Sequence, residues 1–428
     1  MTQPAVIVVG AGPGGSAAAI SLRQHGVAVT LLDQSCFPRE KVCGDVLLPA
    51  AQQAIRTLGL DVSDLERRAY HCLGCRYVND TGRCVAGTFR DLAGLPRPWW
   101  MVRRTVLDTW LVEGARRAGT DVRQGWRVQR VLRDRDGGVC GVQVRRPDGS
   151  SEAMAAAAVV GADGANSVVA RNMGLLMRQP EDICLATRAY VSGLEGFDPY
   201  LTIFSTTQTL PGCAWIAPVG RYEANIGLGL LQVDAQRLGV TPQGLFNAMR
   251  QHCPGLKEHL RGATVHAWQG WWLPGATERR PLVGNGFLLV GDAGAMVDPF
   301  TGHGIHHALH AGILAGEILA AAVRSGRVTA DALRPYETHC RATILSETAL
   351  GYRLQRLHAH PFLVSLGIRV CSLHPGLRWA LLALIGHSAD RRAILSGRHL
   401  ARAIFTPGPA NAEGATAGHH RRSTAGAS

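Results

Sequence analysis

Short apolar runs alternate with helical patterns along most of the 428-residue chain. Four runs are mostly β-branched or aliphatic and are bounded by Gly or Asp, which is typical of buried parallel strands. They are Ala5–Val9, Val27–Leu32, Ala157–Val160 and Phe287–Val290. Because each is followed by a turn that contains Gly, the pattern predicts a doubly wound α/β domain.

Two other stretches have a different pattern. Residues 70–100 and 183–275 are richer in Trp, Tyr and Thr and show alternating hydrophobicity, as expected of an antiparallel sheet. They interrupt the first kind of strand. We therefore expect a discontinuous α/β domain (residues 1–69, 101–182 and 276–345) into which an antiparallel-sheet substrate domain is inserted.

The C-terminal region has apolar helical stretches that are interrupted at Pro361 and Pro375, where helices should break or begin. This pattern predicts a small helical cap over residues 346–406. Residues 407–428 are small and polar and have no periodicity, so we expect a disordered tail.

One piece of this cap, LRWALLALIG, is apolar but too short to span a bilayer. Arg378 lies within it, and Arg391, Arg392 and Arg398 follow it. Two hypotheses stay open: a helical cap over the substrate cavity, or a basic, apolar surface that rests on an anionic membrane.

The composition is that of a globular protein, with 46% hydrophobic, 18% charged and 6% aromatic residues. These fractions exclude collagen, a coiled coil and a wholly disordered chain. No run approaches the roughly 20 apolar residues that span a bilayer, and the N-terminus lacks the basic start of a secretory signal. We expect a cytoplasmic protein, with peripheral contact to the inner membrane face as an option.

The net charge of +13 rests almost entirely on arginine, because only Lys41 and Lys257 are lysines among the 45 basic residues. From Arg341 to Ser428 there are 11 Arg and three acidic residues. These basic stretches lack interleaved aromatic residues that could stack on bases, so we expect no binding to nucleic acid.

The 11 cysteines do not form a disulfide framework in a chain of this length. Cys72 and Cys75 form a C-x-x-C pair with Cys84 nearby, but no second pair follows at zinc-finger spacing. We favour buried free thiols over a metal site here.

The strongest local motif is G-x-G-x-x-G, formed by Gly10, Gly12 and Gly15 between a strand and an Ala-rich helix. Gly10 permits the tight turn, Gly12 lets a diphosphate approach the backbone, and Gly15 permits close helix–strand packing. The next strand ends in Asp33, which can accept hydrogen bonds from ribose hydroxyls. The pattern predicts a bound dinucleotide with its phosphates at the helix N-terminus.

Two later motifs resemble those of the FAD-dependent flavoprotein monooxygenase superfamily, whose members are similar to p-hydroxybenzoate hydroxylase. They are Asp163-Gly164 and Gly291-Asp292, the latter followed by Pro299, Gly302 and Gly304. The resemblance implies that Asp292 binds the ribityl chain of FAD. It also implies that the Pro299–Gly304 backbone stabilises negative charge at the isoalloxazine N1/O2 edge.

A third match to the superfamily is the R-x-x-L-D helix that begins at Arg104. By this resemblance Arg104 reaches the FAD phosphate or the ribityl region. The alternative is a solvated helix arginine.

Two segments resemble the geranylgeranyl reductase family in particular. Phe37–Pro49 matches the family's F-P-R-x-K-x-C-G-[DE] stretch, and Leu210–Leu231 matches its P-x-x-Y-x-W-x-F-P-x-G segment with the N-x-G-x-G strand that follows. Cys213 and Ala217 stand where the family usually has Tyr and Phe. Those aromatic residues line the family's polyprenyl cavity, so we expect both departures to alter its shape.

Three residues are candidate catalytic groups. The resemblance places Cys43 and Gly44 near the flavin, where the Cys43 thiol either donates a proton or is only a small residue that packs there. His303, between two glycines, would face the flavin or the substrate. Trp215 is the matched tryptophan of the cavity segment.

His303, His306, His307 and His310 share one helix face by their i, i+3, i+4 and i+7 spacing. No carboxylate lies near them in the sequence, and flavin binding already accounts for the helix. We expect no metal site.

Together the motifs predict a discontinuous Rossmann-type FAD-binding domain with an inserted substrate domain and a helical cap. Only one dinucleotide fingerprint is present, so NAD(P)H or another reductant would bind transiently. The first hypothesis is a reductase that saturates C=C bonds of an isoprenoid or other apolar substrate by hydride transfer from the flavin. The alternatives are a monooxygenase that hydroxylates an aromatic small molecule or peptide Trp through a flavin hydroperoxide, and a flavin-binding sensor without turnover.

Overall fold

A computed structural model describes residues 6–89, 98–176, 179–194, 198–275, 280–387 and 391–398. The predicted disordered tail, residues 407–428, lies outside the described residues, as does the end of the predicted cap.

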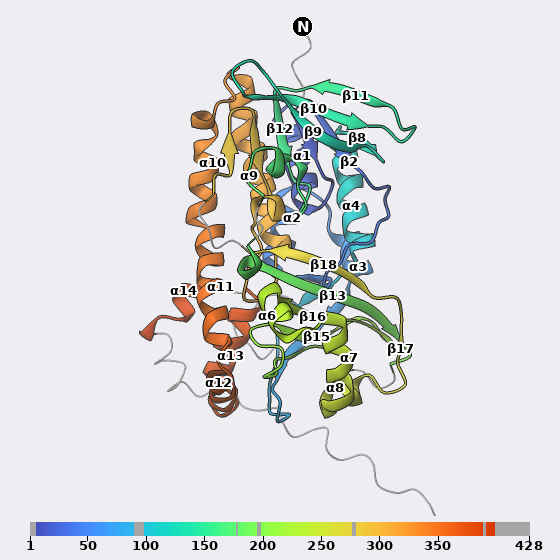
Figure 1. Cartoon of the computed structure of the whole chain (residues 1–428), viewed down its shortest axis with the longest axis vertical. Coiled ribbons are helices and arrows are strands. Elements are labelled where there is room, and N and C mark those ends of the chain that lie inside the picture. Colours follow the sequence, from blue (N-terminus) through green and yellow to red (C-terminus); the bar gives the residue numbers. More distant parts are fainter. Residues whose placement is uncertain are drawn as a thin grey trace, which may run out of the picture.

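A six-stranded sheet occupies one end of the molecule (Figure 1). Its order is β19-β20-β12-β1-β2-β8, and all neighbours are parallel except the antiparallel pair β19 and β20. The strands are β1 (Val6–Val9), β2 (Val29–Asp33), β8 (Asp121–Gln124), β12 (Ala158–Gly161), β19 (Val283–Gly284) and β20 (Phe287–Leu289). The four strands expected from the apolar runs, β1, β2, β12 and β20, are confirmed.

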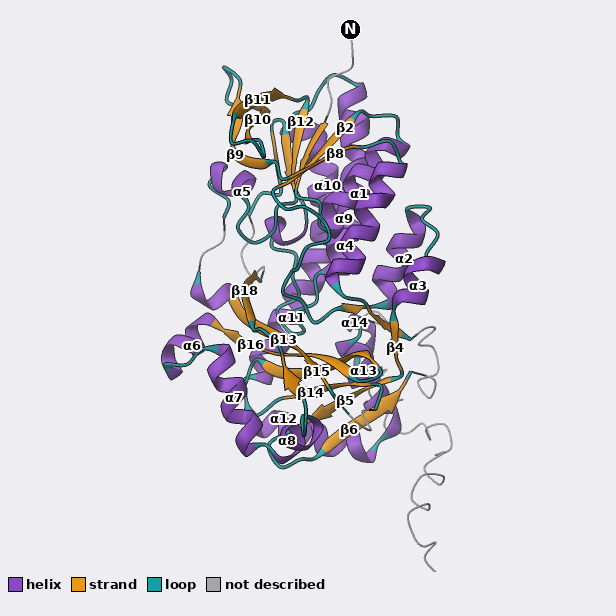
Figure 2. Cartoon of the chain, turned by 90° about the vertical axis from the view of Figure 1, so that its right-hand side faces the viewer, coloured by secondary structure: helices purple, strands orange, loops and turns teal. Residues whose placement is uncertain are grey.

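Helices cover one face of this sheet (Figure 2). α1 (Pro13–Gln24) lies directly against α9 (Ile305–Arg324) because both helices present small residues. A Cβ atom at Gly312 of α9 would lie 2.3 Å from the Gly14 carbonyl oxygen, so only glycine permits this approach. The remaining elements of this part are α2 (Pro49–Thr57), α3 (Ser63–Arg68), α4 (Arg104–Arg117), α5 (Val168–Asn172), α10 (Ala330–Ala342) and the 3₁₀ turn η2 (Gly291–Gly294).

α9 is, among the described residues, the one helix long and apolar enough to cross a membrane by length and composition. The expectation that no apolar run approaches that length is therefore wrong for α9. Its most apolar window is 61% buried inside the protein, because the helix packs between α1 and its other neighbours in the core. α9 is thus a core helix in this fold.

A β-meander covers the other face of the parallel sheet. It consists of β9 (Arg127–Arg133), β10 (Val139–Arg145) and β11 (Ser151–Ala155). Alternate strand residues point to opposite faces, so Val6 and Val8 pack toward the helices while Ile7 and Val9 pack with valines of the meander. A doubly wound domain would have helices on both faces, and here the meander replaces one helical layer.

The residues predicted to form an antiparallel sheet build a second sheet at the other end of the molecule. Its order is β17-β13-β16-β15-β14-β5-β6, and β18 also pairs with β13. The strands are β5 (Gly74–Val78), β6 (Cys84–Thr88), β13 (Ile183–Ser192), β14 (Tyr200–Phe204), β15 (Cys213–Gly220), β16 (Glu223–Leu231), β17 (Thr264–Val265) and β18 (Gln269–Pro274).

One pair in this sheet departs from the antiparallel expectation. β5 and β14 are parallel. They come from the two separate segments of the chain, and the long connection between them runs through the α/β part, as a parallel pair requires. A small sheet of β3 (Val46–Leu47), β7 (Trp99–Met101) and β4 (Tyr70–Cys72) lies between the two parts.

Helices pack around the second sheet, with α7, α8 and α12 at its far end (Figures 1 and 2). α12 and α13 begin at Pro361 and Pro375, as predicted from the sequence. The elements are η1 (Pro180–Asp182), α6 (Gln232–Leu238), α7 (Pro242–His252), α8 (Pro254–His259), α11 (Ile344–His358), α12 (Pro361–Leu373), α13 (Pro375–Ile385) and α14 (Arg391–Ile394). The domain boundaries drawn from the sequence stay a prediction.

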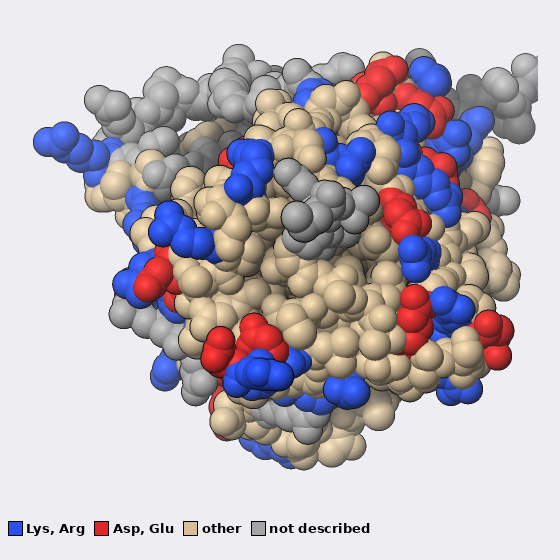
Figure 3. Space-filling view, turned by 90° about the horizontal axis from the view of Figure 1, so that it is seen from above, with Lys and Arg blue, Asp and Glu red and all other residues tan. Residues whose placement is uncertain are grey.

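Basic and acidic side chains lie in mixed groups on the face seen in Figure 3. Among the described residues, several basic side chains form short-range ion pairs, such as Arg123 with Asp121 and Arg334 with Asp331. The expectation that the chain binds no nucleic acid stays a prediction.

Candidate active site

A cavity of about 1050 Å³ lies between the six-stranded parallel sheet and the second, largely antiparallel sheet. One wall is formed at the carboxyl ends of the parallel strands, where Gly10 follows β1, Asp33 ends β2 and Asp163 follows β12. Open α/β sheets bind their ligands at this edge. The opposite wall comes from the second sheet and includes Cys184 and Trp215.

The turn between β1 and α1 has the geometry that the three glycines predict. Gly10 has a φ of 97°, and a Cβ atom there would lie 2.4 Å from the Ala162 carbonyl oxygen. At Gly15 a Cβ atom would lie 1.8 Å from the Gly10 carbonyl oxygen, whereas at Gly12 the nearest atom would be Arg39 Nη2 at 3.7 Å. Gly10 and Gly15 thus permit close packing, while Gly12 leaves the backbone open toward the cavity.

Two helix N-termini open onto the same cavity. α1 starts after Gly12 and α9 after Gly304, and neither has a side-chain cap. The first N–H groups of a helix lack intrahelical acceptors and carry partial positive charge, so each end favours an anion. A diphosphate at α1 and an electron-rich ring at α9 fit this arrangement.

Asp33 and Asp163 both line the cavity, but both are also used to fold their loops. Asp33 accepts hydrogen bonds from the N–H groups of Ala11 and Ser35, each at 2.8 Å. Asp163 accepts from the Ser167 hydroxyl at 2.5 Å and from Val168 N–H at 2.6 Å, so it holds the turn before α5. Their predicted contacts with FAD stay predictions.

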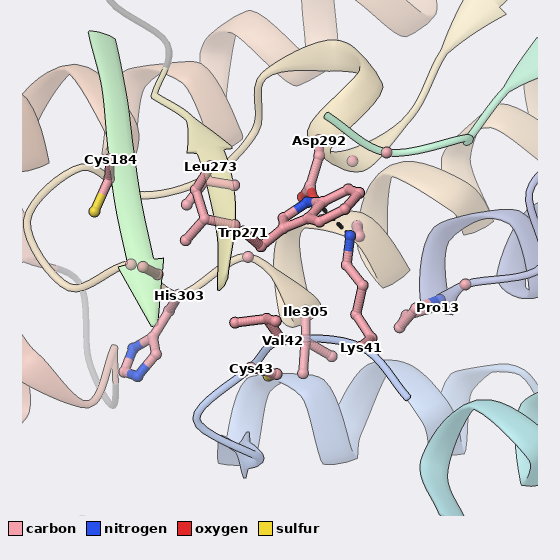
Figure 4. Close-up of a pocket in the computed structure, with 18 of the residues that line it drawn as sticks. Pro13, Lys41, Val42, Cys43, Cys184, Trp271, Leu273, Asp292, His303 and Ile305 are labelled. Carbon is pink, nitrogen blue, oxygen red and sulfur yellow. Dashed lines mark ion pairs between the residues drawn. The ribbon is translucent and has the colours of Figure 1, made fainter. Parts of the chain in front are cut away.

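Asp292 faces Lys41 across the cavity (Figure 4). Lys41 Nζ lies 3.9 Å from the Asp292 carboxylate and 4.7 Å from the centre of the Trp271 ring. Burial lowers the pKa of Lys41. The sequence analysis did not select Lys41 as a site residue, although it is one of two lysines among 45 basic residues and lies inside the Phe37–Pro49 segment.

Arg104 lies at the cavity wall as predicted, and its guanidinium is already paired. It donates to both Asp108 carboxylate oxygens, at 2.8 and 2.7 Å, and its positive charge lowers the pKa of the Cys43 thiol. Arg39 also contacts Asp108, at 3.0 Å. Arg104 is therefore a fixed positive charge beside Cys43, and its predicted reach to FAD stays a prediction.

Cys43 and Gly44 both line the cavity. Burial raises the pKa of the Cys43 thiol, so it stays protonated near neutral pH. The Asp45 N–H donates a hydrogen bond to its sulfur at 3.3 Å. The Cys43 S–H group therefore lies beside the positive charge of Arg104 and the N–H of Asp45, and both stabilise a thiolate.

Asp45 is a site residue that the sequence analysis missed, although it is the acidic position next to Cys43-Gly44 in the family motif. It is fully buried, and its Oδ2 accepts from Tyr190 Oη and Asn225 Nδ2, both at 2.8 Å. Burial raises its pKa to about 6. Asn225 also donates to the Cys43 carbonyl at 2.7 Å, so Asp45 and Cys43 belong to one hydrogen-bonded network.

Replacing Asp45 with asparagine should change the pH dependence of stability. The folded-state pKa of Asp45, about 6, lies above its ordinary value of 3.8, so its contribution is complete below pH 4 and is lost as the pH rises through 6. Asp45→Asn does not lose this contribution. Its free energy of unfolding, measured relative to that of the wild type, should therefore rise by roughly 2 to 3 kcal/mol between pH 4 and pH 7. Urea unfolding at both pH values measures the difference.

Asp331→Asn is the matched control, because the Asp331 side chain is 82% exposed. It should show no comparable gain. Equal pH profiles for the wild type and Asp45→Asn would contradict the assignment of a raised pKa to Asp45.

Trp215 is held as part of the same network. Its indole N–H donates to Asn225 Oδ1 at 3.0 Å, and its ring lies against the backbone of Gly227, where a Cβ atom would be 2.2 Å away. The ring therefore forms a fixed part of the cavity wall. A catalytic role for Trp215 stays a prediction.

The two departures from the family segment lie in different places. Cys213 lines the cavity, and burial raises the pKa of its thiol to about 12. Ala217 is fully buried in a hydrophobic cluster with Cys72 and Trp99 and does not line the cavity. The expectation that the loss of an aromatic residue at Ala217 alters the cavity stays a prediction.

The loop that contains Pro299, Gly302 and Gly304 lines the cavity beside His303. Burial, and next the neighbouring His387, lowers the pKa of His303 to about 3, so the ring is neutral near pH 7. A neutral His303 with an unpartnered Nδ1 can orient a ligand but does not act as an imidazolium acid.

The C-x-x-C thiols are buried and free, as expected. Cys72 and Cys75 are both fully buried, and burial raises the pKa of Cys72 to about 11.

A glycine loop, two uncapped helix ends and a long cavity between two sheets define an FAD-dependent flavoprotein oxidoreductase. Residues 3–347 match the family model described as FAD binding domain. The chain belongs to the geranylgeranyl reductase family of these flavoproteins.

Two curated relatives carry this assignment. The chain is 31% identical over 343 residues to a menaquinone reductase from Mycolicibacterium smegmatis, covering 77% of this chain and 78% of that protein. It is 30% identical over 347 residues to digeranylgeranylglycerophospholipid reductase 1 from Methanopyrus kandleri, covering 78% and 84%.

Solved structures show the same fold. A geranylgeranyl bacteriochlorophyll reductase-like protein from Thermoplasma acidophilum matches with a TM-score of 0.79 and 21% identity, over 94% of this chain and 96% of that chain. The flavin-dependent brominase Bmp2 matches with a TM-score of 0.68 and 22% identity, over 90% and 94%.

Proposed function

We propose that this flavoprotein saturates C=C bonds in an isoprenoid or similarly apolar substrate. The observation that carries the proposal is the partly buried, protonated Cys43 thiol, which lies on the cavity wall between the cofactor loops and the second sheet. The two curated relatives named as reductases of menaquinone and of digeranylgeranylglycerophospholipid support it.

Reduced FAD, held along the glycine loop, would supply a hydride to one carbon of the double bond. Cys43 donates its thiol proton to the other carbon, and Arg104 and the Asp45 N–H stabilise the thiolate that remains. Asp45, with a pKa of about 6, is mostly a carboxylate at neutral pH and accepts a hydrogen bond from Tyr190 within the network that holds Cys43. NAD(P)H or another carrier replaces the electrons between turnovers.

The second-sheet side of the cavity suits a prenyl chain. Its wall is largely apolar and excludes water from the reacting carbons. The lining residues on this side include Leu201, Ile203, Pro211, Trp215 and Leu273.

A monooxygenase acting on an aromatic ring is the second candidate. Cys213, which stands where the family has Tyr, favours it by widening the cavity wall. The fold shared with a brominase permits it but adds no argument about chemistry.

Oxygen separates the two candidates. Anaerobic single turnover of the reduced, FAD-loaded protein with prenylquinones should give a product that, after its ring is reoxidised to the quinone, is two hydrogens heavier in the prenyl chain, and aromatic substrates should remain unchanged. A product that forms only in the presence of O₂, and that carries isotopic oxygen supplied as labelled O₂, would overturn the proposal that the protein is a reductase.

We also propose that the protein touches the inner face of an anionic membrane, from which a lipid substrate would be drawn. The burial of the described residues favours a different surface for such a contact than the one chosen from the sequence. α13 is largely buried, and Arg391 is 1% exposed in an ion pair with Asp298, so neither is available to lipid. α12 is exposed instead, with Ile368 as its one buried residue.

The apolar face of α12 consists of Phe362, Leu366 and Leu373, which are 75%, 45% and 69% exposed. Their i, i+4 and i+11 spacing places them on one side of the helix. Residues 361–387 hold Arg369 and Arg378 but no acidic residue, so an anionic lipid surface complements their charge. Ile368, on the other side, packs in the cluster that includes Trp215 of the cavity wall.

Removing this face should abolish membrane attachment. We expect the variant F362S/L373S to lose at least roughly tenfold in co-sedimentation with phosphatidylglycerol vesicles at low salt, because two apolar side chains no longer leave water. Leu238→Ser, at an exposed leucine on α6, should bind like the wild type. Equal binding to phosphatidylcholine vesicles, or no effect of the double substitution, would contradict the proposal.

A further inference from the structure

Three histidines and one glutamate meet behind the Pro299–Gly304 loop. His306 and His307 begin α9, Glu347 lies on α11, and His387 follows α13. One ligand-type atom from each lies within 4.8 Å of the other three. The expectation that no carboxylate lies near these α9 histidines is therefore wrong, because α11 brings Glu347 from 40 residues away in the chain. His310 is not part of this histidine–glutamate cluster.

The hydrogen bonds of His307 leave a lone pair directed at the glutamate. Its Nδ1 lies 2.8 Å from the Met296 carbonyl oxygen, which can only accept, so Nδ1 carries the hydrogen. In the neutral ring Nε2 is then an acceptor, yet it lies 3.1 Å from Glu347 Oε2, another acceptor. A cation between these two atoms removes the conflict.

His387 repeats the same arrangement. Its Nε2 lies 3.3 Å from the Asp298 carboxylate, which leaves Nδ1 as the acceptor in the neutral ring. That Nδ1 is buried without a hydrogen-bond partner, 3.7 Å from Glu347 Oε2. His306 adds a buried Nε2 that also has no partner, on a side chain in a residue only 5% exposed. His307 and His387 thus direct lone pairs at a carboxylate, and His306 adds a nitrogen without a partner beside them.

The surrounding charge accommodates a divalent ion. Glu347 and Asp298 carry two negative charges and Arg391, which binds Asp298 at 2.9 and 3.0 Å, carries one positive charge. A divalent ion with neutral histidines gives the same net charge as two imidazolium rings with no metal. Only an experiment that detects the metal separates these two states.

We propose that this cluster binds one divalent transition metal ion, zinc in the first place, through His306, His307, His387 and Glu347. Three nitrogen donors and one carboxylate suit zinc, and the Met296 carbonyl and Asp298 are the outer partners that orient metal-bound histidines. Tetrahedral zinc needs donor atoms roughly 3.4 Å apart, so the side chains close by about 1 Å on binding. The Glu347 side chain, 41% exposed, provides the entry path.

The ion would hold three parts of the chain together. α9 carries the flavin-facing loop at its start, α11 supplies Glu347, and His387 belongs to the C-terminal helices. Binding at this point would therefore fasten the helical cap to the loop beside the cavity.

Metal content of the FAD-loaded full chain, purified without an affinity tag, tests the proposal. After chelation and reloading with Zn²⁺, the wild type should retain one equivalent by mass spectrometry, and Co²⁺ should give the visible bands of a four-coordinate site. His306→Leu and Glu347→Gln should each weaken binding at least roughly tenfold, while His339→Ala, on the exposed face of α10, should not.

Thermal unfolding separates a metal ligand from a packing residue. Zn²⁺ should raise the unfolding temperature of the wild type but not of His306→Leu, whose metal-free stability should stay close to that of the wild type because His306 Nε2 has no hydrogen-bond partner. A wild type that retains no metal and is not stabilised by Zn²⁺ would overturn the proposal in favour of protonated histidines. Retention by His306→Leu and Glu347→Gln alike would overturn it too.

Discussion

Cys43→Ala should lower the rate of double-bond saturation by roughly 10²- to 10⁴-fold, the range that positioned proton donors contribute. The substitution removes the S–H group that faces the cavity and leaves the glycine loop and both helix N-termini intact. FAD binding and reduction of the bound flavin should therefore change little. Anaerobic stopped-flow measurement of flavin oxidation by substrate isolates the affected step.

Two further variants sharpen this prediction. Cys43→Ser keeps an O–H donor and should recover part of the rate, whereas Cys36→Ala, at an exposed cysteine outside the cavity lining, should match the wild type. A Cys43→Ala rate within threefold of the wild type would mean that water, not the thiol, supplies the proton.

Asp298→Asn should destabilise the folded protein by roughly 3 to 5 kcal/mol, because it leaves a buried charge without its partner. Asp298 and Arg391 are 0% and 1% exposed and are joined by two hydrogen bonds, at 2.9 and 3.0 Å. Arg391 begins α14, so the C-terminal helices should become sensitive to protease first. Urea unfolding and limited proteolysis of the FAD-loaded protein measure both effects.

A double-mutant cycle tests the origin of this loss. Combining Asp298→Asn with Arg391→Met removes both charges and should cost less than the sum of the single changes. Asp331→Asn breaks an exposed pair with Arg334 and should stay within about 0.5 kcal/mol of the wild type. Strict additivity of the two buried changes would show that the pair makes no joint contribution.

The cofactor half of the protein could be predicted because its signals are local. Strand, glycine turn, helix and the acid at the end of the next strand all lie between residues 6 and 33, and Gly10 and Gly15 are required by contacts within that unit or beside the neighbouring strand. Apolar runs of the right length therefore predicted β1, β2, β12 and β20. The same local patterns located the helix starts at Pro361 and Pro375.

The chemistry beside the cofactor site depends on contacts between residues that are far apart in the chain. Asp45 acquires its role from Tyr190 and Asn225, which are 145 and 180 residues away in the chain. Its pKa of about 6 comes from burial, which depends on how the two sheets pack and which no local pattern records. In the same way Ala217 occupies a position in the family's cavity segment, yet its side chain lies in a buried cluster.

The sequence by itself determined the class of protein, since three ordered motifs and a family segment specify an FAD-binding oxidoreductase. Tertiary structure decided which charges are buried. It took Arg391 out of the predicted membrane surface by pairing it with Asp298, and it brought Glu347 and His387 to the α9 histidines. The reason is physical: short-range motifs fix backbone geometry, whereas burial, pKa and ligand sets arise where residues far apart in the chain share one desolvated volume.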